Sequence, residues 1–229
     1  RLSEMSSKGP FLEEDIAISN IALDFIGQAN ELLLYAAQVE GKGHTEDDLA
    51  FKRTEREFYN VLLTEQLNTD FAYVMMRQFL MDAFDFHFYG ALKKSTDATL
   101  SAIAEKSHKE IVYHLRHSSK WVERLGDGTE ESNRRITDAL ANLWRFTGEL
   151  FEMTTVDELL LKAGVAVDLN SIKTAWEKTV SETLQRATLS MPQNVFMQRG
   201  SRDGKHTEHL GYLLAEMQHL HRAFPGVNW

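Results

Sequence analysis

The chain has 229 residues, of which 43% are apolar and only three are proline, so it is long enough to form one domain with a substantial core. Its net charge is −9 and it has no run of Lys and Arg, which argues against nucleic acid as a partner. It contains no cysteine, which excludes disulfides, thiolate zinc sites and cysteine nucleophiles and is consistent with a cytoplasmic protein. No apolar stretch approaches the roughly 20 residues needed to cross a bilayer, so we expect no membrane span.

The chain starts at Arg1-Leu2-Ser3, without an initiator Met or a signal-like apolar region. We therefore expect residues 1–229 to form a single helical domain whose N-terminal helix is truncated. The first long helix is predicted over residues 13–40, where apolar residues recur at spacings of three and four. Acidic residues at its start and glycines just after it are typical start and stop signals.

The rest of the chain also has the pattern of helices joined by short polar connections. The later helices are predicted, in chain order, over residues 47–63, 71–93, 98–125 and 131–153, from Thr155 to a stop at Gly164, and over 170–188 and 206–224. Residues 191–204 are predicted to be an extended loop, and no segment has the alternating pattern of a strand. These patterns predict an all-α protein: a ferritin-like antiparallel four-helix bundle with additional C-terminal helices.

The four long predicted helices carry acidic residues in the order that a di-metal carboxylate bundle uses. In such a bundle two helices each supply one Glu and two others each supply Glu-x-x-His, because residues three apart share a helix face. The corresponding residues here are Asp24, Asp82, Asp85, Glu110, Glu149 and Glu152. The two positions that would hold histidine, 85 and 152, are carboxylates instead. We therefore interpret this set, together with His114, as a vestigial site that binds no metal and no cofactor.

Several carboxylates inside one bundle raise one another's pKa unless cations lie nearby. One hypothesis is an internal ion-pair network, because His114, Arg145, Lys106 and Lys109 lie near these acids along their helices. A second hypothesis is that several of the acids simply face water. A third is that the set, with His114, forms a carboxylate-rich di-iron or di-manganese oxidase.

Other polar clusters give weaker signals. Glu105-x-x-His108 and Glu216-x-x-His219 match the metal motif but fall outside its helix order, so we favour exposed helix positions for both. The C-terminal histidines could form a zinc-like site, although a polar interface helix is the favoured interpretation: they are His206, His209, His219 and His221. Residues 200–206 favour a flexible turn over a contact for a partner or for acyl-CoA phosphates.

Four blocks of the sequence resemble one protein family. They are residues 21–29, 109–116, 143–151 and 206–211. In this order, and across the whole chain, the sequence resembles the PaaC family of phenylacetate-degradation proteins. Members of that family are ferritin-like, non-catalytic subunits of the multicomponent phenylacetyl-CoA 1,2-epoxidase.

The resemblance implies a heterodimer, or a higher hetero-oligomer, with a homologous catalytic subunit that holds a di-iron centre and binds phenylacetyl-CoA. It also implies a small bridging subunit and an iron–sulfur flavin reductase, with oxygen and NADPH as co-substrates of the complex. This chain would then carry no cofactor and would position the catalytic subunit. A stand-alone helical module that binds CoA thioesters is the remaining alternative.

Overall fold

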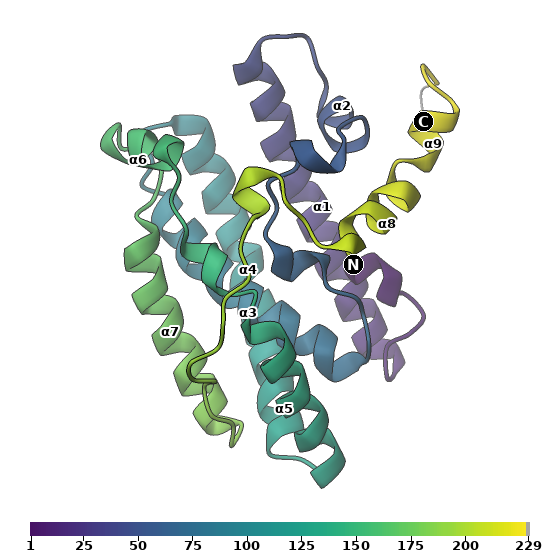
Figure 1. Cartoon of the computed structure of the whole chain (residues 1–229), viewed down its shortest axis with the longest axis vertical. Helices are drawn as coiled ribbons and strands as arrows, with labels where there is room; N and C mark the ends of the chain where they lie inside the picture. The colour runs from purple at the N-terminus through teal and green to yellow at the C-terminus, as the bar shows by residue number, and fades with distance from the viewer. Residues whose placement is uncertain (228–229) are drawn as a thin grey trace.

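The computed structural model describes residues 1–227, and every regular element in that range is helical (Figure 1). The α-helices are α1 (Leu12–Glu40), α2 (Glu46–Phe51), α3 (Phe71–Leu92), α4 (Ala98–Gly126), α5 (Glu130–Trp144), α6 (Thr155–Lys162), α7 (Leu169–Arg186), α8 (Glu208–Met217) and α9 (His219–Ala223). Short 3-10 turns connect several of them: η1 (Leu2–Met5), η2 (Glu55–Glu57), η3 (Leu62–Glu65), η4 (Gly148–Phe151) and η5 (Ser201–Asp203). The all-α prediction is confirmed. None of the helices in residues 1–227 is long and apolar enough to span a bilayer.

The long helices α1, α3 and α4 form where the sequence predicts them, because local signals define their ends. Gly41 follows α1 in the left-handed region, with φ +66°, and its N–H donates to Ala37 O over 3.1 Å. Asp70 caps α3 by accepting from Tyr73 N at 2.8 Å. Asp97 caps α4 in the same way, by accepting from the backbone N–H groups of the second and third helical residues.

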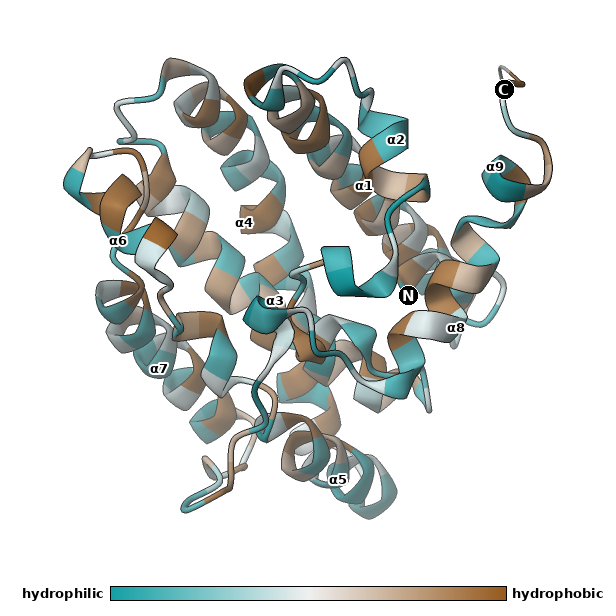
Figure 2. Ribbon diagram, turned by 45° about the horizontal axis from the view of Figure 1, so that its top comes forward, coloured by the Kyte–Doolittle hydropathy of each residue, from teal (hydrophilic) through white to brown (hydrophobic). Residues whose placement is uncertain are grey.

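Helix α3 lies at the centre of the fold and packs against α4, α5 and α7 (Figure 1). Its apolar residues are buried on several sides, including Met76, Phe79 and Leu80. The indole N–H of Trp176 in α7 donates to Leu80 O over 2.9 Å, which ties the two helices together. Helices α5 and α7 carry hydrophilic as well as hydrophobic residues, as Figure 2 shows, because only one face of each is covered.

The helix predicted over residues 47–63 is wrong beyond residue 51. Only α2 forms there, and the chain then continues through the turns η2 and η3. The reason is tertiary: Leu62 N donates to the side chain of Glu149, and the amide of Gln218 donates to Ala50 O and Arg53 O. These bonds replace the i to i−4 ladder that would have continued the helix.

The helix predicted over residues 131–153 also ends early, at Trp144. The hydroxyl of Thr147 donates to Trp144 O at 2.8 Å, and Gln198 N donates to Arg145 O at 2.8 Å. Gly148 then lies so close to Met197 that a Cβ on it would stand 2.9 Å from Met197 Cγ. The loop after α7 therefore takes the space that the fourth long helix was expected to fill, and residues 149 and 152 do not lie on a long helix.

Smaller differences affect the C-terminal third. Thr154 and Asp157 form the capping box of α6, one residue earlier than predicted. The last predicted helix, 206–224, is divided into α8 and α9 at Gln218, whose buried amide donates to Arg53 O at 2.9 Å and to Ala50 O at 3.3 Å. This amide holds the C-terminal helices against α2.

Candidate functional site

The predicted acidic set divides into two groups in the structure. Asp24, Asp82, Asp85 and Glu110 lie on the long helices α1, α3 and α4, of which α4 packs against both α1 and α3. Glu149 lies on η4, and Glu152 follows that turn directly. The order of residues along the chain is therefore preserved, but the second Glu-x-x-Glu segment has lost the helix geometry on which the comparison with a di-metal bundle depended.

Asp24 pairs with His114 across α1 and α4. His114 Nε2 lies 2.9 Å from Asp24 Oδ2, and the imidazole is fully buried while Asp24 remains partly exposed. Burial lowers the pKa of His114, and the neighbouring carboxylate of Asp24 opposes that shift. His114 Nδ1 is buried and has no partner in the part of the chain that the structure describes. A neutral imidazole that donates through Nε2 fits this arrangement.

Asp82 is fully buried and accepts two side-chain hydrogen bonds. Gln78 Nε2 lies 2.5 Å from Oδ1, and Ser118 Oγ lies 2.6 Å from Oδ2. Burial raises the pKa of Asp82 well above its ordinary value, and the nearby charge of Asp85 adds to the shift, whereas the two hydrogen bonds oppose it. Asp82 is therefore held as a structural carboxyl group that favours its neutral form.

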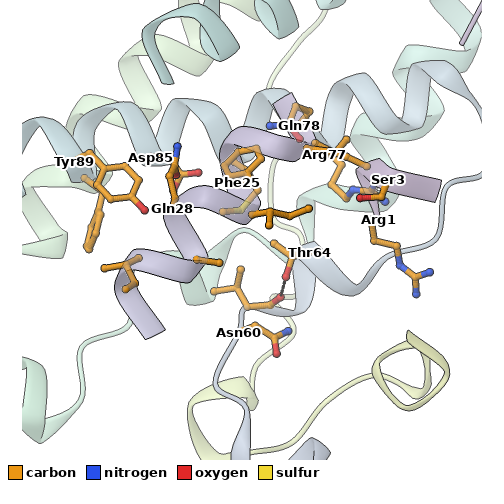
Figure 3. A pocket seen from close by; sticks show the side chains of 18 of the residues that line it. Arg1, Ser3, Phe25, Gln28, Asn60, Thr64, Arg77, Gln78, Asp85 and Tyr89 are labelled. Carbon is orange, nitrogen blue, oxygen red and sulfur yellow. Dashed lines mark hydrogen bonds between the residues drawn. The ribbon is translucent and has the colours of Figure 1, made fainter. Parts of the chain in front are cut away.

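Asp85 lies one turn further along α3 and faces a cavity of about 810 Å³ between α1, α3 and residues 59–64. Figure 3 shows Gln28, Gln78 and Tyr89 around the same cavity as Asp85, with Phe25 among its apolar walls. Burial raises the pKa of Asp85 to about 7. At this position the side chain therefore offers carboxylate oxygens where a di-metal bundle has a histidine nitrogen.

Glu110 on α4 accepts from Gln28 on α1, with Gln28 Nε2 2.8 Å from Glu110 Oε2. The buried Glu149 accepts from the backbone N–H groups of Leu62 and Ser201, the latter at 3.4 Å. Burial raises the pKa of Glu149, although these N–H groups oppose the shift. Glu152 forms an ion pair with Arg199, whose Nε lies 2.9 Å from Oε1.

The predicted ion-pair network forms only in part. His114 does pair with one of the six acids, but the other three predicted cations do not. Lys106 pairs with Glu31 at 2.5 Å, and Lys109 pairs with Glu105 at 3.4 Å. The guanidinium of Arg145 lies over the ring of Phe146 instead. Side-chain amides, a hydroxyl and backbone N–H groups therefore satisfy three of the six carboxylates, those of Asp82, Glu110 and Glu149.

The histidines near the C-terminus have separate roles. His206 contacts Glu65, and the ring of His221 stacks on that of Phe51 with 4.2 Å between centroids. Within residues 1–227, no group of three or more His, Asp and Glu side chains is placed to hold a metal ion. This finding disfavours both the zinc-like site and a di-metal site built from the six acids.

Sequence reasoning missed the contact between Glu65 and His206. Glu65 lies just beyond a segment that we predicted to be helical, 141 residues before His206, so no local pattern connects the two. It also missed the amide partners Gln28 and Gln78. Their spacing of four from Asp24 and Asp82 is the one local signal that could have suggested polar side chains on the same helix faces.

Comparison with known proteins decides the family. The model of the phenylacetic acid catabolic protein family matches residues 1–229. The chain belongs to this family. It is 46% identical over 229 residues to a protein from Escherichia coli (strain K12) that is described as a subunit of 1,2-phenylacetyl-CoA epoxidase, covering 100% of this chain and 92% of that protein. The family resemblance carried by the four sequence blocks is thereby confirmed.

Proposed function

We propose that this chain is the structural, non-catalytic subunit of a phenylacetyl-CoA epoxidase in phenylacetate catabolism, and that it pairs with a di-iron catalytic subunit. Support comes from membership in the family and from the similarity to the E. coli epoxidase subunit. The reaction of such a complex adds one atom of O₂ to the aromatic ring and reduces the other to water with electrons from NADPH. A CoA thioester and NADPH are cytoplasmic substrates, so we expect the complex in the cytoplasm.

The observation that carries the non-catalytic role is the way in which the acidic side chains are engaged. Asp82, Glu110 and Glu149 each accept hydrogen bonds from amide, hydroxyl or backbone donors of the same chain. At Asp82 and Glu149 both carboxylate oxygens already accept such a bond, so a metal ion there would compete with these donors, and a buried donor that loses its acceptor costs about 1–3 kcal/mol. The residues present therefore do not fit a di-metal centre.

The positions that would bear histidine reinforce this argument. Asp85 faces the cavity with a pKa of about 7, and Glu152 pairs with Arg199. Neither supplies the neutral nitrogen ligand that the Glu-x-x-His motif of a ferritin-like di-iron protein provides. In the proposed complex the di-iron centre and the acyl-CoA site belong to the partner, while a small bridging subunit and a reductase complete the assembly.

The role can be tested by reconstitution. The chain is purified alone and together with the di-iron subunit of the same organism, and each sample is measured for iron and manganese and for epoxidation of phenylacetyl-CoA. We expect less than about 0.1 metal ion per chain alone, no turnover alone, and turnover only in the complex. Two variants of this chain, Asp24→Asn and Glu110→Gln, each remove one carboxylate of the predicted acidic set. The complex formed with either variant should retain turnover within about twofold of the wild-type complex.

Two results would contradict the proposal. About two iron or manganese ions per isolated chain, with oxygen-dependent turnover, would identify a carboxylate-rich oxidase. Tight binding of an acyl-CoA by the isolated chain in titration calorimetry, without any affinity for the di-iron subunit, would identify a thioester-binding module.

A further inference from the structure

Helix α1 has one long face that the rest of the chain leaves uncovered. Leu12, Ile16, Leu23 and Leu34 are all exposed, and Leu12 and Leu23 have 69% and 64% of their surface accessible. At 3.6 residues per turn these four side chains fall within an arc of about 40°. Figure 2 shows hydrophobic residues along α1 together with hydrophilic ones. A single exposed Leu is ordinary, but four in one line along a helix form a packing surface.

Small and polar residues fill the positions between these four. We call the whole line the outer seam of α1, and it comprises Leu12, Ile16, Ser19, Leu23, Gly27, Asn30 and Leu34. Its spacings of three and four are those of a helix that packs along another helix. A Cβ on Gly27 would meet no atom within 4 Å, so the backbone is open to close approach in the middle part of the seam. The seam is about 33 Å long, enough to hold a helix of some six turns.

Two other faces of α1 pack within the chain, and part of the helix around Ile26 and Leu32 lines the cavity described above. Ile18 and Ile21 are buried towards the core. On a third face, polar pairs join α1 to α4 and its cap along most of its length: Glu14 with His117, Asp24 with His114, Gln28 with Glu110, Glu31 with Lys106, and Tyr35 with Asp97. These pairs fix the rotation of α1 about its axis and leave the outer seam pointing away from the chain.

The charges on α1 indicate which partner fits the seam. The helix contains six acidic residues and no Lys or Arg. Glu31 and Glu40 pair with Lys106 and Lys42, so the acidic surface of the helix is carried by Glu13, Glu14, Asp15 and Asp24. Two copies of this chain, each with a net charge of −9, would bring two acidic helices together, which is unfavourable. A different chain with Lys or Arg beside an apolar helix would be complementary in both shape and charge.

We propose that the outer seam of α1 packs against an apolar helix of the di-iron subunit, flanked there by basic residues. This inference rests on the proposed function, since it names the surface through which the structural subunit would hold its partner. Burying several Leu and Ile side chains at the centre of an interface is the kind of contact that excludes water and supports affinity.

The test compares variants of the full chain in binding to the purified di-iron subunit by calorimetry and light scattering. We expect Ile16→Asp combined with Leu23→Asp to weaken binding at least about a hundredfold, because two apolar side chains at the centre of the contact become charged. Gly27→Leu should weaken it at least about tenfold by blocking close approach. The matched control is Leu159→Asp on α6, which is as exposed as Leu23 but lies off the seam and should bind as wild type.

Each outcome has a distinct meaning. If the seam variants keep their helical circular dichroism and melting temperature but lose binding, the proposal stands. If wild type binds the di-iron subunit and the seam variants bind equally well, the seam proposal is wrong while the structural role stands. If wild type does not bind the di-iron subunit at all, the proposed function itself is wrong. If the chain alone is a dimer that Leu23→Asp dissociates, the seam belongs to a second copy and the proposal is overturned.

Discussion

His206 and Glu65 form a buried pair that joins the start of α8 to the turn η3. His206 Nδ1 lies 2.6 Å from Glu65 Oε1, and His206 Nε2 lies 2.8 Å from Phe58 O, so both ring nitrogens face acceptors. The second carboxylate oxygen of Glu65 accepts from Thr207 N at 2.8 Å and from Thr207 Oγ1 at 2.6 Å. A single buried carboxylate therefore anchors the C-terminal helices to a segment more than 140 residues earlier.

Glu65→Ala should lower the free energy of unfolding by about 3 kcal/mol, because it leaves the buried donors of His206 and Thr207 without an acceptor. Urea denaturation measures the change. Hydrogen exchange should show the amides of α8 losing protection before those of α3. The control is Glu216→Ala, an exposed site on α8, which should stay within about 0.5 kcal/mol of wild type. Equal effects of the two substitutions would contradict the anchoring role.

Glu149→Gln should leave epoxidation by the reconstituted complex within about twofold of wild type. The side chain binds backbone N–H groups of Leu62 and Ser201 and is not expected to contact metal. The free energy of unfolding of the isolated variant should nevertheless be about 1–2 kcal/mol lower than that of wild type, since one of those N–H groups would then face an amide NH₂. Turnover and thermal unfolding are measured on the same preparation. Loss of turnover in a fully assembled complex would refute a structural role for this residue.

The free energy of unfolding of the Asp82→Asn variant, relative to that of wild type, should increase as the pH rises. Burial raises the pKa of Asp82 in the folded state, so the folded chain binds this proton more tightly than the unfolded chain does. Wild-type stability therefore falls as the pH rises above the unfolded value of about 4, until Asp82 ionises within the fold. Asn keeps an oxygen for the Ser118 hydroxyl but has no proton to lose.

Calorimetric melting temperatures at pH 5 and pH 8 test this, with Asp47→Asn at an exposed position of α2 as the control. The difference in melting temperature between Asp82→Asn and wild type should be larger at pH 8. An identical difference at both pH values would show that Asp82 does not bind a proton more tightly in the folded state.

Substitution by alanine should have opposite effects on stability at two glycines of the long helices. A Cβ on Gly126, the last residue of α4, would stand 2.1 Å from Ala187 O, so Gly126→Ala should destabilise the chain by about 2–4 kcal/mol. Gly27 has no atom near its Cβ position, so Gly27→Ala should stabilise the isolated chain by about 0.5–1 kcal/mol. Chemical denaturation of the two variants and wild type gives both values, and a stabilising Gly126→Ala would mean that α4 and residue 187 do not meet as described.

The local sequence determined the long helices because their signals lie within a few residues of each end. Periodic apolar residues, the caps Asp70 and Asp97, and the glycine after α1 predict α1, α3 and α4 to within about two residues. The identity of the residues at positions 85 and 152 also follows from the sequence alone, and the absence of histidine there led to the hypothesis of a vestigial site.

Only the tertiary structure decided where the predicted helices at 47–63 and 131–153 end and what each carboxylate contacts. Leu62 N bonds to Glu149, and Gln198 N bonds to Arg145 O, so groups far apart in the chain compete for hydrogen bonds that local propensity assigns to a helix. The partners of the acids are likewise mostly amides, a hydroxyl and backbone groups. A local pattern can show that a carboxylate is present on a helix face, but its charge state depends on the burial and donors that the whole fold supplies.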